Sequence, residues 1–432
     1  MRRRIVALYV GNVRWHIVAL LFVVSFVAYV LRTNMSVAGE KMMPDLGLTK
    51  VQLGLVMAAF AWGYAIFQIP GGIFGDRFGG RRALTQIALA WGGLNLLVGL
   101  LPPAGVLPTT AVLATLVVLR FLMGATQAPL FPITGRVFYN WFPASSWALP
   151  NGLTNTGLTF GAAATGPLIT WLAETIGWRQ SFLVTAPLGF LIAAAWWWYA
   201  RDRPGEHASV SVEEVALIEA DRAPAPAESA GWASWRSVLR NRNVVLLAVS
   251  YFCSNYVFYF FFNWLFIYLV EVRGFKALEG GLYAMWPWVM GAIGAAVGGW
   301  LADRMTVRVG PREGYRIPSM LALVAVAGLI FAAATARDPV VAVVFLSLCL
   351  GLQQLTEGAY WAATIAVSGR HAATGCGVLN TGGNIVGGIG ALMVPFTAER
   401  LGWVPALGTA SVFAVLAAAL WLWIRADEQA HA

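Results

Sequence analysis

The chain has 432 residues, of which 59% are hydrophobic, 13% aromatic and only 11% charged. Soluble globular domains are about half apolar and about a quarter charged, so this composition excludes them and indicates a polytopic membrane protein. The formal net charge of +9 comes from arginines near the ends of apolar segments, so it is a topology signal and we expect no nucleic-acid partner.

A helix needs about 20 mostly apolar residues to cross a bilayer. Segments of this kind recur along the whole chain, which predicts an all-α protein with twelve transmembrane helices. The predicted spans are 14–37, 51–75, 82–101, 109–133, 148–172, 179–200, 243–270, 279–302, 317–336, 339–367, 374–398 and 403–424.

The positions of the basic residues predict the orientation of these spans. Cytoplasmic segments of membrane proteins carry an excess of Lys and Arg. Placing the N-terminus inside puts most arginines on that side, from Arg2, Arg3 and Arg4 at the start to Arg425 near the end. We therefore expect a multi-pass protein of the cell (inner) membrane, in contact with the lipid bilayer, with both termini in the cytoplasm.

Two internal echoes indicate a duplicated chain. The sequence "GGIFGDRFGGRR" at 71–82 matches "GGWLADRMTVRVGPR" at 298–312, and "LTNTG" at 153–157 matches "LNTGG" at 379–383. The repeat predicts two pseudo-symmetric six-helix halves. Their expected bounds are 1–200 and 243–432, with residues 201–242 as a cytoplasmic connector.

The connector is the only long polar segment. Ser211 and Glu214 have the spacing of a capping box, which predicts a short helix. The run "APAPAE" at 223–228 is typical of a stiff linker, and the basic run at 231–243 suits the surface of the inner leaflet.

The repeated loops carry charged residues where each span meets the cytoplasm: Asp76, Arg77 and Arg81 in the first half, and Asp303 and Arg304 in the second. Each acid is placed to meet arginines or helix ends when the inner mouth of a transporter closes, so these residues are candidate gating residues. The alternative is that any short polar loop needs charged ends.

Arg32 and Arg120 are the two basic residues that the predicted spans leave inside the membrane. At about 1.5 Å per residue, Arg32 lies roughly 24 Å along its helix from His16, beyond the midplane on the outer side. Its side chain either snorkels to the outer interface or belongs to a polar site with Tyr29, one turn back on the same face.

Several motifs resemble those of the major facilitator superfamily. The loop at 71–82 is similar to the signature between the second and third helices of that superfamily. The Tyr-x-x-Arg-x-Asn-x-Ser-x-Ala run at 29–38 and the sequences "RFLMGATQAPLFP" at 120–132, "RDRPGEH" at 201–207 and "FFFNWLFIYL" at 260–269 resemble its anion:cation symporter branch. The resemblance implies a transporter of organic anions, such as sugar acids.

The resemblance also implies an anion site. In that branch the arginine that matches Arg32 and the tyrosines that match Tyr29 and Tyr64 surround the substrate carboxylate, and Gln68 lies one turn beyond Tyr64. A guanidinium fork with phenolic hydroxyls suits bidentate capture of a carboxylate. With Arg120, these residues form the predicted substrate site of the first half.

The sequence indicates the residue that couples transport to protons less directly than it indicates the anion site. Proton-coupled members of the branch resemble one another in two acids, and the matching positions here hold Leu31 and Gln127, neither of which accepts a proton. Glu357 is the only acid well inside a predicted span, at the depth that Gln127 has in the other half. It is either a proton carrier, or a fixed partner of Arg120, or a polar packing contact.

Other polar and aromatic residues are further candidates for substrate contact. Asn380, Asn384 and Asn155 have side chains that hydrogen-bond polyhydroxy compounds, and Trp361 and Tyr259 have rings that stack on a substrate. Each has an alternative role in helix packing along glycine-rich runs.

Three functions are compatible with the sequence. The first is secondary active import of a small organic anion by alternating access, with proton symport. The second is an anion facilitator or exchanger without proton coupling, and the third is a non-transporting membrane sensor. An enzyme is disfavoured because no cluster of nucleophile and base, metal motif or nucleotide loop is visible. We expect no cofactor and no bound metal, and a monomer.

Overall fold

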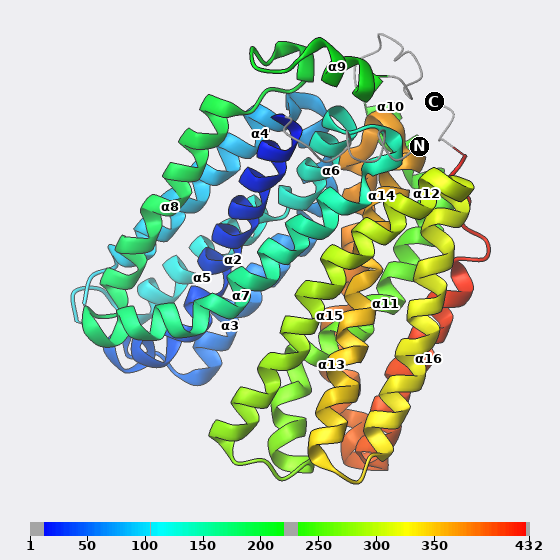
Figure 1. Ribbon diagram of the computed structural model, residues 1–432. Coiled ribbons are helices and arrows are strands. Elements are labelled where there is room, and N and C mark those ends of the chain that lie inside the picture. The colour runs from blue at the N-terminus through cyan, green and yellow to red at the C-terminus, as the bar shows by residue number, and fades with distance from the viewer. Residues whose placement is uncertain (1–12, 104, 220–231, 429–432) are drawn as a thin grey trace. The chain divides into compact units, whose positions relative to one another are not determined.

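The computed structural model describes residues 13–103, 105–219 and 232–428. The predictions for Arg2, Arg3, Arg4 and the linker 223–228 lie outside these ranges. Within them the chain is helical, without a strand (Figure 1).

The first half of the described chain consists of seven α-helices of ordinary or long length. Their apolar composition and lack of early breaks explain why most exceed 16 residues. They are α2 (Val13–Leu46), α3 (Lys50–Ile66), α4 (Gln68–Gly99), α5 (Thr109–Gln127), α6 (Leu130–Trp141), α7 (Ala148–Thr175) and α8 (Trp178–Tyr199).

The second half follows two short helices, α9 (Val212–Glu219) and α10 (Trp232–Arg240). Its first long helix ends in a π-helical turn, Tyr268–Val272. The long helices are α11 (Arg242–Ile267), α12 (Ala277–Thr335), α13 (Pro339–Leu355), α14 (Glu357–Ser368), α15 (Ala372–Leu401) and α16 (Trp403–Leu420).

Two glycines divide helices that are otherwise continuous. Gly79 in α4 has φ 79° and ψ 161°, and Gly310 in α12 has φ 85° and ψ 165°. Only glycine adopts such angles readily, and both lie in the repeated loop motif. Each break separates two of the predicted spans.

Length and composition alone mark seven described helices as able to cross a membrane, or up to eight with the bent pair Val51–Ile66 and Gln68–Gly99, whose axes differ by 51°. One of the seven, Leu282–Thr335, has 54 residues and contains Gly310, so it holds two predicted spans. The Asn- and Thr-containing α7 is not among the seven.

Two compact units share the chain. One comprises residues 1–143 and 160–229, and the other comprises 144–159 and 230–432, so α7 begins in the second unit and continues in the first. In the first unit α3 packs on α5, and α4 packs on α8. In the second, α12 packs on α13, and α11 packs on α15. The six-helix bounds taken from the repeat stay a prediction.

Glycines allow close contacts between neighbouring helices in both units. A Cβ on Gly63 of α3 would overlap the carbonyl oxygen of Phe121, and one on Gly124 of α5 would overlap that of Phe60. In the second unit a Cβ on Gly294 of α12 would overlap the carbonyl of Gly351 on α13. Small residues at such crossings let backbones approach, which is how membrane helices gain packing energy.

The connector helix α9 is held against the start of α2. The Ser211 hydroxyl accepts from the N–H of Glu214, as the predicted capping box requires. The Glu214 carboxylate, however, accepts from the N–H groups of Val13 and Arg14 at 3.2 Å each. An anion at this position stabilises the N-terminal turn of α2 through the helix dipole.

We predict that Gly124→Ala lowers the stability of the protein, because the added methyl group would overlap the backbone carbonyl oxygen of Phe60 on α3. Overpacking of this kind costs about 1–3 kcal/mol, which thermal unfolding in detergent measures. The matched control is Gly93→Ala in α4, where a Cβ meets nothing within 4 Å and helix propensity favours alanine. Equal melting temperatures for the two variants would contradict the packing described.

Candidate functional site

Arg32 lies among aromatic side chains of α2 and α3. Its Nη1 donates to the hydroxyl of Tyr29 at 3.2 Å. Its guanidinium carbon lies 5.1 Å from the ring centre of Tyr29, 5.0 Å from that of Phe60 and 4.4 Å from that of Tyr64. Cation–π attraction stabilises a guanidinium in such surroundings, so the rings support the charge inside the membrane-spanning part of the protein.

Arg120, on α5, lies beside this cluster. Its side chain is 5% exposed, its Nη2 donates to the carbonyl oxygen of Arg32 at 3.0 Å, and its guanidinium carbon is 4.8 Å from the ring centre of Phe60. Its buried Nε has no hydrogen-bond partner among the described residues. Two guanidinium groups therefore share the ring of Phe60, and one of them has an unused donor.

Neither α3 nor α5 contains an acid, and the acids of α2, Glu40 and Asp45, lie two turns or more beyond Arg32 in the sequence. Residues 46–75 and 77–173 contain no Asp or Glu, and these ranges include α3, nearly all of α4, α5 and α6. Arg120 is buried and Arg32 is half-buried, and two like charges this close raise each other's energy. The arrangement is suited to an anion with two or more oxygen acceptors.

The two glutamines near the pair are both buried. Gln68 begins α4, directly after the bend at Phe67. Gln127 ends α5, and its Nε2 donates to the carbonyl oxygen of Ala28 on α2 at 2.9 Å. Leu31, in the other position where proton-coupled relatives have an acid, is part of the apolar core.

Glu357, the first residue of α14, is buried in the second unit at 4% exposure. One of its carboxylate oxygens accepts from the Tyr251 hydroxyl at 2.8 Å and from the Trp361 indole N–H at 3.3 Å. The other accepts from Gln353 Nε2 at 3.4 Å. All three donors are neutral, so hydrogen bonds rather than an ion pair stabilise the carboxylate in this arrangement.

The predicted asparagines of α15 form a short hydrogen-bonded chain. Asn384 donates to the side-chain oxygen of Asn380 at 2.9 Å and accepts from the Tyr259 hydroxyl, also at 2.9 Å. Asn155 donates to Gln354 at 3.5 Å. The candidate residues of the second unit thus lie on α7, α11, α14 and α15, and α13 supplies hydrogen-bond partners.

The loop of the first unit places Asp76 with its side chain only 2% exposed and 4.0 Å from Arg136 of α6. Arg77 lies over the ring of Phe78 at 5.5 Å. Arg81 donates through Nε and Nη2 to the carbonyl oxygen of Trp197, at 3.0 and 2.7 Å. Arg77 and Arg81 therefore have different partners, and Asp76 forms its ion pair with Arg136.

The loop of the second unit places Asp303 at a helix end. Its carboxylate oxygens accept from the N–H groups of Ala148 and Leu149, at 2.8 and 2.9 Å. These are the first two residues of α7, so the charge lies where the helix dipole favours an anion. Arg304 lies over the ring of Trp300 at 5.4 Å.

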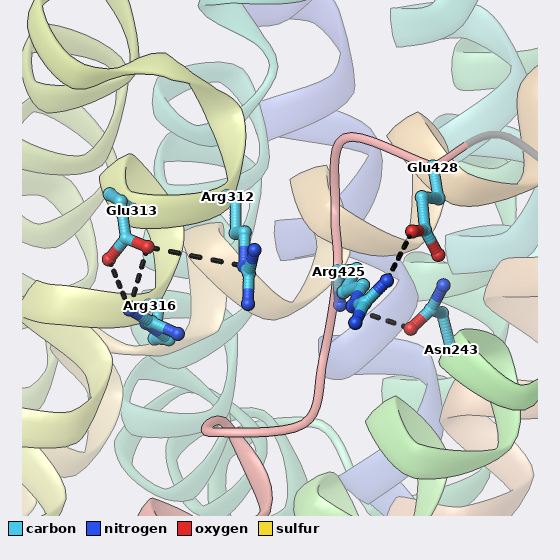
Figure 2. Close-up of polar contacts among 6 residues, drawn as sticks. All are labelled: Asn243, Arg312, Glu313, Arg316, Arg425 and Glu428. Carbon is cyan, nitrogen blue, oxygen red and sulfur yellow. Dashed lines mark hydrogen bonds and ion pairs between the residues drawn. The ribbon is translucent and has the colours of Figure 1, made fainter.

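Further charged groups follow Gly310. Glu313 lies 2.6 Å from Arg316 and 4.0 Å from Arg312, and Figure 2 marks both contacts. It also shows Arg425 close to Glu428 and Asn243, the second residue of α11. The hydrogen bond from Arg425 lowers the pKa of the exposed Glu428 carboxyl below its ordinary value. These contacts lie in the polar segments after Gly310 and near Arg425, which the sequence predicts on the cytoplasmic side.

Sequence reasoning missed four residues of these sites: Phe60, Arg136, Asp202 and Tyr251. Phe60 lies one turn before Tyr64, which is a usable signal, but 24 Phe residues made it indistinct. Asp202 accepts from the N–H of Arg81 at 2.9 Å, directly after the turn at Gly79. Such long-range partners have no local signature.

Comparisons with known proteins define the class. The model of the Major Facilitator Superfamily matches residues 21–353. The probable sulfoacetate transporter SauU of Cupriavidus necator is 30% identical over 90% of this chain and 88% of that protein. The probable galactarate/D-glucarate transporter GudP of Escherichia coli is 32% identical over 69% of this chain and 68% of that protein.

The fold agrees with a solved structure. FucP, a Major Facilitator Superfamily transporter in the outward conformation, aligns with a TM-score of 0.73 at 17% identity, over 96% of this chain and 100% of that chain. The chain belongs to the Major Facilitator Superfamily. The predicted resemblance and the all-α polytopic fold with twelve helices are confirmed.

We predict that Asp303→Ala lowers stability by about 0.5–2 kcal/mol, the usual effect of removing an acceptor at a helix N-terminus. Asp303→Asn has a smaller effect, because an amide oxygen still accepts one hydrogen bond. Thermal unfolding of the purified variants measures both, with the exposed Asp427→Ala as control. A control as damaging as Asp303→Ala would show that the α7 contact contributes nothing.

Proposed function

We propose that this chain is a secondary active transporter that imports a small organic anion, a sugar acid or related carboxylate, by alternating access. The observation that carries the proposal is the pair Arg32 and Arg120 around the ring of Phe60, with no acid in α3 or α5. The unused Nε donor of Arg120 supports it. The two relatives named above, a probable sulfoacetate transporter and a probable galactarate/D-glucarate transporter, agree with such a substrate.

The substrate site on this proposal includes Arg32, Tyr29, Tyr64, Gln68 and Arg120 in the first unit. Two guanidinium groups provide charge-assisted hydrogen bonds to the anion, and the phenol of Tyr29 is already directed at Arg32. In the second unit Trp361, Asn380 and Asn384 are the proposed contacts for the remainder of the substrate.

Gating on this proposal depends on the repeated loops. Asp76 of one loop is paired with Arg136 of α6, and Asp303 of the other loop is bonded to the N-terminus of α7, and both contacts are proposed to form in only one of the transport states. A contact made in one state only shifts the equilibrium between states without touching the ligand. Arg77, Arg81 and Arg304 are proposed to support these loops. The proposed setting is the inner membrane, with cytoplasmic termini and a monomeric protein.

Proton symport is the proposed driving reaction, with Glu357 as the proton carrier. Glu357 is the acid deep in the second unit, and its neutral donors leave both ionisation states possible without a fixed ionic partner. A second candidate function, anion exchange without protons, is favoured by Leu31 and Gln127. Leu31 has no ionisable group, and Gln127 is bonded to the backbone of α2.

We predict that Arg32→Ala reduces uptake at least a hundredfold, because the anion loses charge-assisted hydrogen bonds worth about 1.5–3 kcal/mol each. Arg32→Lys restores little, since an ammonium cannot donate in a planar fork. The measurement is uptake of labelled sulfoacetate, D-glucarate and D-glucuronate into proteoliposomes, normalised to folded protein. Uptake by the alanine variant at the native rate would refute the anion site.

We predict that Glu357→Gln retains substrate exchange but loses uphill accumulation driven by a pH gradient, because an amide does not bind and release a proton. Counterflow and gradient-driven uptake in the same proteoliposomes separate the two activities. The control is the native protein, assayed with and without the pH gradient. Survival of uphill uptake in the variant would assign the coupling elsewhere, and a native protein insensitive to the gradient would favour the exchanger.

A further inference from the structure

One face of α5 holds two neighbouring helices at once. Arg120, Gly124 and Gln127 are spaced by four and three residues, so they lie on the same side of the helix. Gly124 packs against the backbone of Phe60 on α3. Arg120 and Gln127 both donate to backbone carbonyl oxygens of α2, at 3.0 and 2.9 Å.

The two acceptors on α2 bracket the anion site. They are the carbonyl oxygens of Arg32 and Ala28, which are one helical turn apart, and Tyr29 lies between them in the sequence. Within a helix each of these carbonyls already accepts from an N–H four residues on. A carbonyl oxygen has two lone pairs, so the side chains of α5 add a second bond at each.

The added bonds fix this turn of α2 along its axis and in rotation. They join two helices in apolar surroundings, where water offers no alternative partner for the donors. Since Tyr29 and Arg32 project from the bracketed turn, their direction depends on its placement. A shift of about 1 Å in a positioned group is enough to weaken its function strongly.

The two donors differ in what else they do. Arg120 carries a charge and belongs to the proposed anion site, so its removal would affect binding directly. Gln127 is uncharged and 3% exposed, and its amide is directed at the backbone of α2. We propose that Gln127 is a positioning residue, which holds the Tyr29–Arg32 turn so that the guanidinium of Arg32 faces the substrate; this rests on the proposed function.

The first test is Gln127→Leu, which keeps the size of the side chain and removes the donor. We expect the KM for exchange of the labelled anion to rise about tenfold, as for loss of one buried hydrogen bond, with kcat changed less than twofold. The control is Thr126→Val, which removes a hydroxyl bonded only within α5, to Leu122 and Met123. Both variants are normalised to folded protein.

The second test is Gln127→Glu, which makes the donor depend on pH. A protonated carboxyl group keeps an O–H that donates to the Ala28 carbonyl, whereas the carboxylate has no donor. Expressed relative to the native protein at the same pH, the affinity of this variant should be near native in acid and fall as the pH rises. The ionised carboxylate would also repel the anion, so this pH dependence supports the positioning role only if Gln127→Leu, which adds no charge, has a raised KM as well.

The outcomes separate the two proposals. The probes are labelled sulfoacetate, D-glucarate and D-glucuronate, in counterflow without a pH gradient. If the native protein exchanges none of them, the proposed function fails, and the role of Gln127 with it. If the native protein exchanges one and both Gln127 variants keep its KM at every pH, the positioning role is overturned while the transporter stands.

Discussion

The site in the first unit depends on a guanidinium pair gathered around one aromatic ring. Arg32 and Arg120 lie 5.0 and 4.8 Å from the centre of Phe60, and neither α3 nor α5 contains an acid. Burying a charged side chain within the membrane costs free energy, so such residues usually have a function. The rings lower this cost, the backbone contacts fix the geometry, and an anionic substrate would neutralise the excess charge.

The packing of α5 against α2 and α3 brings the two arginines together. Arg120 reaches the carbonyl of Arg32 only because α5 lies close to both α2 and α3, and Gly63 and Gly124 permit that approach. The second unit has a similar plan with a different charge. There, Gly294 brings α12 close to α13, α14 begins directly beyond, and its first residue is Glu357, held by three neutral donors.

Local rules accounted for much of this arrangement. The repeated loop motif marked where the helices break, though not that Gly79 and Gly310 would make the turns. Helical spacing brought Tyr29 to Arg32, where the hydrogen bond is found. Hydropathy supplied the twelve spans. These features depend on residues within a few turns of one another.

Other features depend on contacts that no local pattern encodes. The bond from Gln127 to Ala28 requires α5 to lie against α2 at a particular height, and the ring of Phe60 becomes distinctive only when a third helix supplies Arg120. The carboxylate of Glu214 was expected to close a capping box, yet it binds the N-terminus of α2, which is far away in the sequence. In each case the tertiary packing determines the partner, and the local sequence does not distinguish that partner from other residues.

The central claim is that the first unit recognises negative charge. The most direct measurement is counterflow in proteoliposomes with pairs that differ in charge and otherwise only in a methyl group per carboxyl, such as D-glucuronate and its neutral methyl ester, extended to D-glucarate and its dimethyl ester. The account predicts that an anion of the set is exchanged and that its neutral partner competes more than tenfold less well. Equal competition by the neutral partner would contradict it.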